Sequence, residues 1–358
     1  MIRIKRIMTK KILRRACILL IAGLSCVQIQ AGNPDRQGEA GATELLFNPW
    51  ARSAGLHSMS TASVFGVEAL RLNIAGLSRL QGSELLIANT RLFEGSDIKL
   101  NALGFGRKMG ENSAFGVTLT SVDFGDIPIT TAAQPEGTGG TFSPNFFHIG
   151  VGYSYIYANK ISVGILVRGI SESLTNANAF GIALDAGVQY VTGEDDNFRL
   201  GISLRNIGSP MTFGGEGLSY EVQNPGTTTD FPITFDARAE SFELPSLLNI
   251  GMSYDFIPTT DIKIRTLANF TANSFSRDEV GAGVEFFFKD FVALRAAYKV
   301  ELDPGTQVER SVYTGFAAGF SLYLPVKKLA NQKIGIDYAY RATNPFRGTH
   351  NFTVRLNL

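Results

Sequence analysis

Cysteine is nearly absent from this 358-residue chain, and its two copies, Cys17 and Cys26, both precede Ala31. If the chain is cleaved after Ala31, the remaining protein has no thiol, which excludes disulfide and thiolate chemistry. Histidine is also scarce, and none of its copies has a second ligand at metal-binding spacing: His57, His148 and His350. Because Ser, His and acidic residues are too dispersed to form a catalytic triad, we expect neither an enzyme nor a cofactor or metal site.

After its first segment the chain also lacks any apolar run long enough for a membrane-spanning helix. Residues 1–31 are typical of a secretory signal peptide, with seven basic residues before an apolar run from Ala16 to Leu24. That run is too short to cross a bilayer as a helix. Ile29-Gln30-Ala31 is an acceptable cleavage site, so the mature protein is predicted to begin at Gly32. The alternative, a lipid on Cys26, requires a lipobox that Gly23-Leu24-Ser25 matches poorly.

Positive charge is not in excess in the exported part of the chain. Loss of the seven basic residues of the signal changes the formal charge from +1 to −6. A mildly acidic protein is not expected to bind nucleic acid. An exported chain without a later apolar helix is either periplasmic or a barrel in the outer membrane.

What the chain does have, from Ser83 onward, is alternation between apolar residues and polar residues or glycine. In the segment 145–158, Ile149, Val151 and Tyr153 oppose His148 and Ser154. The segments are roughly ten to fourteen residues long, whereas soluble strands usually run about five or six. Their apolar faces end in Tyr and Phe, as interfacial girdles do. A soluble sandwich would alternate too, but length and aromatic ends favour strands between lipid and a polar lumen.

The predicted fold class is all-β, a transmembrane antiparallel β-barrel of about 14 strands with an N-terminal plug. An even strand number is what closed bacterial barrels require. The expected strands are 83–93, 96–109, 113–124, 145–158, 160–172, 179–191, 197–207, 246–257, 261–272, 278–289, 290–300, 311–324, 332–342 and 348–358. The segment 261–272 is expected to need a bulge, because its alternation slips after Ile264.

Two further features indicate a closed outer-membrane barrel. The two longest connections, 125–144 and 208–245, fall at the same end of the predicted barrel, as extracellular loops do. The final strand ends on the apolar Leu358, which resembles the recognition signal of outer-membrane barrels, although the usual terminal residue is Phe. Closure is required because an open sheet would leave unpaired backbone groups in hydrocarbon.

Residues 32–82 lack the alternation, and we interpret them as an N-terminal arm and plug that precede a barrel of residues 83–358. The part from Asn48 to Leu77 is rich in Ala, Ser and Gly, which let backbone pack closely against backbone. It is predicted to fold into the barrel and occlude it, whereas the alternative is an arm lying outside. The residues expected to shape the plug are Asn48, Pro49, Arg52, Gly55, Asn73 and Gly76.

Several charged residues fall on the predicted lumenal face of the strands. They are Arg168, Asp185, Arg199, Arg205, Asp255 and Arg355. They could line a path for a solute. We expect instead that they pair with one another and with the plug, and so fill the barrel.

Two stretches of the plug resemble the PorV/PorQ family of outer-membrane proteins, which are relatives of the FadL fatty-acid transporters. They are Pro49-Trp50-Ala51-Arg52-Ser53-Ala54-Gly55-Leu56 and Asn73-Ile74-Ala75-Gly76-Leu77. The family pattern is an Ala-Arg-small-Ala-Gly run followed by an Asn-Pro-Ala-Gly-Leu run. Here Ile74 replaces the family's Pro, and Leu56-His57-Ser58 stands where a Gly pair is common.

The resemblance implies a fourteen-stranded barrel with an N-terminal hatch, set in outer-membrane lipid. PorV-like members are non-enzymatic components of the type IX protein secretion system of the Bacteroidetes. The implied partners are the translocon barrel and the C-terminal domains of secreted cargo, bound through extracellular loops. The alternative function is a FadL-like outer-membrane transporter of hydrophobic molecules. A third hypothesis is an outer-membrane lipase or protease.

The connection 208–245 carries many apolar side chains for a loop. Exposed apolar groups at this density usually mark a contact surface. Because buried aromatic side chains tend to dominate interface energies, the expected partner-binding anchors are Phe213, Tyr220, Phe231 and Phe235. The same groups could line an apolar ligand pocket, which would favour the transporter.

Overall fold

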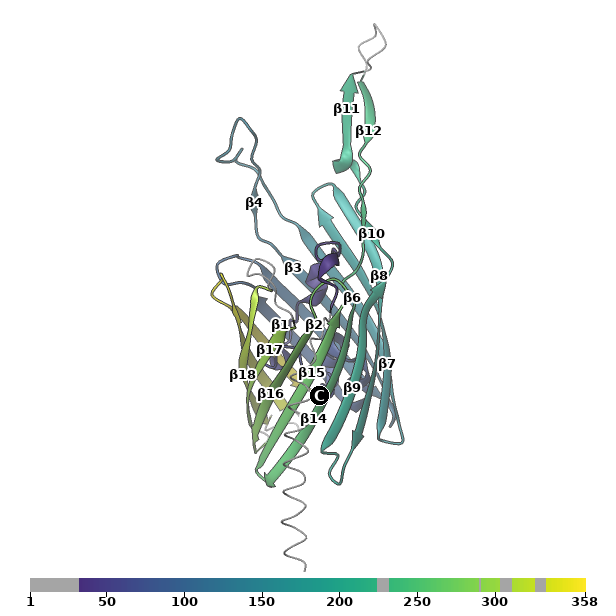
Figure 1. Cartoon of the computed structure of the whole chain (residues 1–358), viewed down its shortest axis with the longest axis vertical. Helices are drawn as coiled ribbons and strands as arrows, with labels where there is room; N and C mark the ends of the chain where they lie inside the picture. The colour runs from purple at the N-terminus through teal and green to yellow at the C-terminus, as the bar shows by residue number, and fades with distance from the viewer. Residues whose placement is uncertain (1–31, 224–231, 290, 303–310, 326–332) are drawn as a thin grey trace, which may run out of the picture. The chain divides into compact units, whose positions relative to one another are not determined.

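The computed structural model describes residues 32–223, 232–289, 291–302, 311–325 and 333–358. Within these ranges, long antiparallel strands close into a single barrel of fourteen, which confirms the predicted fold class. Strand β1 (Ser83–Arg91) pairs with β2 (Lys99–Met109) and also with the last strand, β20 (Thr349–Asn357), and the second pairing closes the sheet (Figure 1). The predicted signal segment 1–31 and Phe231 lie outside the described residues.

The remaining barrel strands follow in chain order, and their ends lie within three residues of the predicted ones. They are β3 (Ser113–Asp123), β6 (Asn145–Tyr157), β7 (Ile161–Leu174), β8 (Ala177–Thr192), β9 (Phe198–Gly208), β14 (Leu247–Thr259), β15 (Ile262–Asn273), β16 (Glu279–Phe288), β17 (Val292–Glu301), β18 (Tyr313–Pro325) and β19 (Lys333–Thr343). Short ribbons extend two connections: β4 (Ile127–Pro128) with β5 (Thr141–Phe142), β10 (Met211–Thr212) with β13 (Ser241–Phe242), and β11 (Ser219–Gln223) with β12 (Pro232–Asp236).

The barrel has an apolar outer face and a polar, small-residue inner face. On β6, Ile149, Val151 and Tyr153 are 43 to 46% exposed, while His148 and Ser154 on the other face are buried. A closed strand ladder leaves no unpaired backbone edge, and an exposed apolar belt around it can only be solvated by lipid. The protein is therefore an outer-membrane barrel. No described helix is long and apolar enough to cross a membrane.

The two ends of the barrel differ in the length of their connections. At one end, turns of two to five residues join β2 to β3, β6 to β7, β8 to β9, β14 to β15 and β16 to β17. The other end carries the long connections 124–144 and 209–246. Short turns face the periplasm in barrels of this kind, so we call these the periplasmic and extracellular ends. The carbonyl of Leu358 accepts from the Ser83 amide at 3.0 Å at the periplasmic end, where the chain closes.

The bulge predicted after Ile264 is wrong. Strand β15 pairs with β16 without a shift from Ile262 to Thr271, and the irregularity lies across from it, between Phe256 and Thr259 of β14. The alternation only seemed to slip because an apolar residue, Leu267, points into the lumen. There it packs against Leu56 and Met59 of the plug, so an inward leucine needs no change of register.

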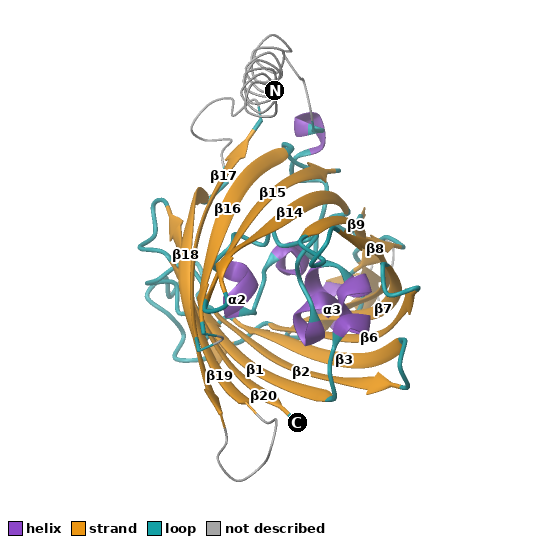
Figure 2. Cartoon of the chain, turned by 90° about the horizontal axis from the view of Figure 1, so that it is seen from below, coloured by secondary structure: helices purple, strands orange, loops and turns teal. Residues whose placement is uncertain are grey.

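Residues 32–82 run from the extracellular end to the start of β1 as short helical pieces joined by turns. These are η1 (Pro34–Arg36), η2 (Thr43–Leu46), α2 (Ala51–Ala54), η3 (Gly66–Glu68), α3 (Ala69–Leu72) and η4 (Ile74–Arg79), and a further one, η5 (Glu216–Leu218), lies in a loop. Seen along the barrel, α2 and α3 lie inside the ring of strands (Figure 2). Helix α2 contacts β18, β19 and β20, whereas η4 contacts β6, β7 and β8 across the lumen.

Candidate functional site

The first plug motif is tied to the strands that close the barrel. The Asn351 side chain of β20 donates to the carbonyl of Asn48 at 2.8 Å, and Thr353 Oγ1 accepts from the Ala51 amide at 2.9 Å. The Asn48 side chain in turn accepts from the Trp50 amide at 3.1 Å, which turns the chain into α2. These bonds satisfy buried polar groups that water cannot reach, so they fix the start of the plug.

The second plug motif is held by Asn73. Its Oδ1 accepts from the Ala75 amide at 3.2 Å and so caps η4, while its Nδ2 reaches the carbonyls of Val188 and Ile202 on the barrel wall at 3.1 and 3.3 Å. A Cβ at Gly76 would lie 2.2 Å from the carbonyl oxygen of Val64, so no larger residue fits there. The predicted plug residues are all buried: Asn48, Pro49, Arg52, Gly55, Asn73 and Gly76.

The plug fills one half of the lumen with apolar side chains. Trp50, Val67, Leu70 and Leu77 belong to one buried cluster with wall residues that include Leu166. Glycines on the wall make the close approach possible: a Cβ on the lumenal Gly152 would sit 2.6 Å from Ile74. Close packing of this kind leaves no continuous space in this half of the lumen.

The other half of the lumen is filled by charges, and its centre is Arg355 on β20. The guanidinium donates to Glu84 at 2.6 Å and to Asp337 at 3.3 Å, and it also donates to Glu68 of the plug. All four side chains are at most 3% exposed. Arg355 thus joins the plug to the first, penultimate and last strands.

A second set of buried charges continues around the wall from β9 to β17. Arg199 and Arg265 share the carboxylate of Asp255 at 2.8 and 2.7 Å. Glu285 lies 3.2 Å from Arg295 and 3.5 Å from Arg265. Arg52 of α2 approaches the same Glu285 at 4.0 Å, so this set also touches the plug.

The remaining expected lumenal charges are paired as well. Arg168 binds Asp185 at 2.5 Å, and the Arg205 guanidinium donates to the Leu45 carbonyl of the plug at 3.5 Å. Each of the six lumenal charges therefore contacts another charge or the plug, which confirms the pairing that we expected.

Two cavities lie in the charged half of the lumen, and the plug segment 52–58 contributes residues to both. The extracellular cavity, about 410 Å³, lies among η2, the plug turn at His57 and Ser58, and the upper ends of β14 to β19. The periplasmic cavity, about 260 Å³, lies below, between Arg52 and Phe65 of the plug and the lower ends of β15 to β20. The Arg52 guanidinium lies 4.1 Å above the Phe65 ring, which holds both side chains over the periplasmic cavity.

The extracellular cavity has an amphipathic lining. Phe47, Phe93 and Tyr313 supply aromatic surface, with Phe93 at ring-centroid distances of 5.9 and 5.8 Å from the other two. Lys299 is neutralised by Glu279 at 2.7 Å. The cavity can therefore accept an apolar body against its rings while a polar group of the same molecule reaches polar side chains beside them.

Beside these rings the cavity presents buried polar atoms that make no hydrogen bond. Among the described residues, the Nε and Nη2 atoms of Arg341 and the Nε2 atom of His57 make no hydrogen bond. The Arg341 guanidinium lies over the Tyr313 ring at 4.5 Å and is 3% exposed. Burial, with smaller effects from Lys299 and Arg341, holds the pKa of His57 well below its usual range, so this imidazole is neutral. An anion beside Arg341 would satisfy these groups.

The N-terminal arm is attached to the barrel wall at η2, through Glu44. Its Oε1 lies 2.9 Å from His148 Nε2 on β6, and both side chains are nearly fully buried. Burial raises the pKa of Glu44 to about 7, with its own backbone, the Glu172 carboxyl and Arg71 opposing the rise. Near neutral pH this carboxyl is partly protonated and can donate as well as accept. The Arg71 guanidinium donates to the Leu45 carbonyl at 2.6 Å and so holds the same arm.

The expected partner-binding aromatics differ in their surroundings. Tyr220 and Phe235 are 55 and 46% exposed and stack at 6.0 Å across the β11–β12 hairpin. Phe213 instead packs on Phe242 at 5.7 Å, beside a buried cluster that contains Met211. The β11–β12 hairpin thus presents aromatic surface, whereas the base of the connection is part of the packed barrel mouth.

Sequence reasoning did not nominate Arg341, His57 or the Glu285 group as site residues. Alternation places Arg341 on the lumenal face of its strand, which is the signal that could have found it. The three histidines are not brought together: His148 faces Glu44, and His350 accepts or donates with Tyr338 at 2.9 Å. Among the described residues, no three metal-binding side chains cluster.

Comparison with known proteins shows what fold this is. No protein-family model matches the chain, and no curated protein matches its sequence. Among solved structures, the chain is similar to CymD, described as a monoaromatic hydrocarbon channel, with a TM-score of 0.56, 14% identity, and coverage of 86% of this chain and 96% of that one. A TodX variant described in the same words has a TM-score of 0.54, 13% identity and coverage of 86 and 99%. The toluene transporter TodX of Pseudomonas putida has a TM-score of 0.52 and 14% identity, with coverage of 84% of this chain and 96% of that one.

At these identities the similarity establishes a shared fold. The chain shares the overall barrel fold of these channels. Their described cargo is hydrocarbon, and none of the three descriptions names protein secretion.

Proposed function

We propose that this barrel is a non-enzymatic transporter that admits small hydrophobic molecules bearing an acidic group through the outer membrane. The observation that carries the proposal is the pair of cavities, about 410 and 260 Å³, that are lined by opposite ends of the plug segment 52–58. A molecule held in the extracellular cavity would reach the periplasmic cavity once α2 moves. The fold shared with hydrocarbon channels supports this reading, which corresponds to the FadL-like alternative of the sequence analysis.

The preference for an acidic group rests on Arg341. Its guanidinium is buried, lies at the edge of an aromatic cavity and has unpartnered donors. A buried charge without a partner costs free energy, and a ligand carboxylate would remove that cost. A purely neutral hydrocarbon would leave Arg341 as it is.

Replacement of Arg341 by glutamine tests this preference. We expect Arg341→Gln to weaken binding of a fluorescent long-chain carboxylate roughly ten- to a hundredfold, the value of one charge-assisted hydrogen bond, about 1.5–3 kcal/mol. Binding of a neutral aromatic probe of similar size should change little. Arg347→Gln is the matched control, because Arg347 is exposed at the same end of the barrel.

Three outcomes would count against the proposal, each in a different way. Equal loss of both probes would make Arg341 a structural residue, and unchanged carboxylate binding would remove the acidic group from the proposal. If cells with and without the barrel accumulate both probes equally, the transport function itself is wrong.

A second candidate function is the type IX secretion component suggested by the resemblance of the plug motifs to the PorV/PorQ family. The exposed stacked pair Tyr220–Phe235 favours it, because a projecting aromatic hairpin suits a protein contact. The partners would be a translocon barrel and cargo C-terminal domains.

Deletion of the hairpin tests this second function. Replacing 216–238 by a Gly-Ser turn should leave the barrel folded, because the buried residues Met211 and Leu244 at its base are kept. On the secretion hypothesis, partner recovery by pulldown from native membranes should fall to background, whereas uptake of hydrophobic probes should persist. Full partner recovery would show that the hairpin is not the contact surface.

A further inference from the structure

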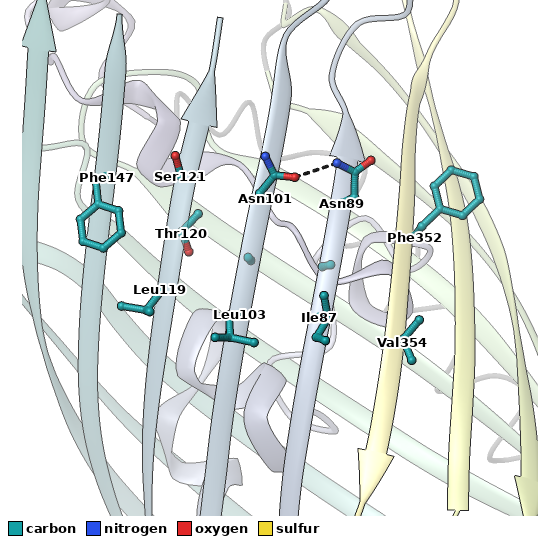
Figure 3. A pocket seen from close by; sticks show the side chains of 12 residues that line it. Ile87, Asn89, Asn101, Leu103, Leu119, Thr120, Ser121, Phe147, Phe352 and Val354 are labelled. Carbon is teal, nitrogen blue, oxygen red and sulfur yellow. Dashed lines mark hydrogen bonds between the residues drawn. The ribbon is translucent and has the colours of Figure 1, made fainter.

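The lipid-facing wall contains a polar row where an apolar belt is expected. Asn89 on β1, Asn101 on β2 and Ser121 on β3 are register partners, and all three point outward (Figure 3). The Asn89 Nδ2 donates to Asn101 Oδ1 at 2.7 Å. This single bond leaves further N–H and C=O groups of both amides facing outward. Unpaired amides at a lipid surface are costly, so the row calls for a polar partner.

The polar row lies in a hollow with aromatic sides. Phe352 on β20 and Phe147 on β6 are the next register partners at its two ends, and they are 47 and 40% exposed. Below the row, toward the periplasmic end, Ile87 and Leu103 continue the apolar wall. The hollow measures about 450 Å³. Small polar side chains between two phenylalanine rings thus form a trough that continues into the belt.

Above the row, one step closer to the extracellular end, two cations lie side by side. Arg91 and Lys99 are register partners on β1 and β2, both are exposed, and neither has an ion pair among the described residues. The nearest acid in register is Asp123, opposite Lys99, and its Oδ1 accepts from the Gly125 amide at 2.9 Å. His350, opposite Arg91, is 3.6 Å from Glu94. Residues two apart on a strand are about 7 Å apart, so the two cations lie about 7 Å from the two amides, toward the extracellular end.

We infer that this surface binds a phosphate-bearing lipid of the outer leaflet. The phosphate lies between Arg91 and Lys99, the polar linkage of the lipid pairs with Asn89 and Asn101, and an acyl chain fills the trough between Phe147 and Phe352. The order of the three layers, cation, amide and apolar, from the extracellular end inward matches the order of phosphate, linkage and chain in such a lipid. This site lies on the outer wall and does not depend on the proposed transport function.

Native mass spectrometry of the full mature barrel, released from detergent with added hexa-acyl lipid A, tests the inference. We expect a one-to-one complex. The double variant Arg91→Gln, Lys99→Gln should bind lipid A at least about tenfold more weakly, because two charge-assisted contacts are lost. Asn89→Leu with Asn101→Leu should also weaken binding while barrel folding, read by heat-modifiable gel mobility, is kept. The matched control is Arg107→Gln, an exposed cation at the periplasmic end of the same strand, β2.

Further probes separate the sources of binding. Lipid A without phosphate should bind as weakly as the Arg91, Lys99 variant, and free inorganic phosphate should not compete. Equal binding of dephosphorylated lipid A, or wild-type binding by the double variant, would overturn the inference. A barrel dimer that disappears in the Asn89, Asn101 variant would show instead that a second copy covers the row, and would also overturn it.

Discussion

Replacing Arg355 by methionine is expected to destabilise the barrel by about 3–5 kcal/mol. The guanidinium neutralises three buried carboxylates, Glu68, Glu84 and Asp337, from the plug and two strands. Methionine fills a similar volume but leaves these acids facing one another without a counter-ion. The free energy of unfolding, from urea titration of the barrel in lipid vesicles followed by gel mobility, should fall accordingly.

A surface ion pair provides the control for this variant. Lys289 and Asp261 are 3.7 Å apart at a periplasmic turn, and both are 56% exposed. Lys289→Met removes the same charge there and should cost no more than about 1 kcal/mol. Adding Glu68→Gln and Glu84→Gln to Arg355→Met should recover part of the loss. Unfolding of Arg355→Met at the wild-type urea concentration would contradict the view that this cluster fastens the plug.

A disulfide between α2 and the wall is expected to reduce transport to the level of cells without the barrel. Ala51 and Ala54 of α2 share a buried cluster with Ala339 of β19, and α2 begins the segment 52–58 that lines both cavities. Cysteines that replace Ala339 and either Ala51 or Ala54 would form a disulfide that fixes α2 to the wall. The helix would then be held across the proposed path of the ligand through the two cavities. The effect should be nearly complete, because a ligand cannot pass a covalently held segment in a packed lumen.

The chain as cleaved after Ala31 contains no cysteine, so only the introduced pair can react. The variants are compared oxidised and reduced, with disulfide formation read from gel mobility and uptake measured with the long-chain carboxylate probe. The single-cysteine variants are the controls, and reductant should restore uptake in the double variants. Undiminished uptake by a fully oxidised pair would mean that the ligand bypasses α2, and the path through the two cavities would be wrong.

The barrel could be predicted from the sequence because the alternation of side chains that indicates it is a local pattern. Each strand separates lipid from lumen, so side chains alternate every two residues, and a window of about ten residues shows this. Closure follows because no edge can be left in hydrocarbon. Leu267 is an exception to this alternation, because it is apolar and points into the lumen, and it led to the wrong prediction of a bulge. Its contact with Leu56 and Met59 of the plug explains its position, and that contact is not visible in the sequence.

The plug motifs were also visible as small-residue runs, but what they do was not. The side chain of Asn73 binds carbonyls more than a hundred residues away on β8 and β9, and Arg355 joins acids from positions 68, 84 and 337. Such partners are set by which strands become neighbours when the barrel closes. No spacing in the chain encodes that.

The sequence by itself therefore determined the class of fold, the number and limits of the strands, and the membrane in which the protein resides. Only the tertiary structure decided that charges fill one half of the lumen, that two cavities lie beside the plug segment 52–58, and that Arg341 keeps buried N–H groups without a hydrogen bond. The physical reason is that alternation depends on neighbours along the chain, whereas cavities and ion pairs depend on side chains that meet only after closure.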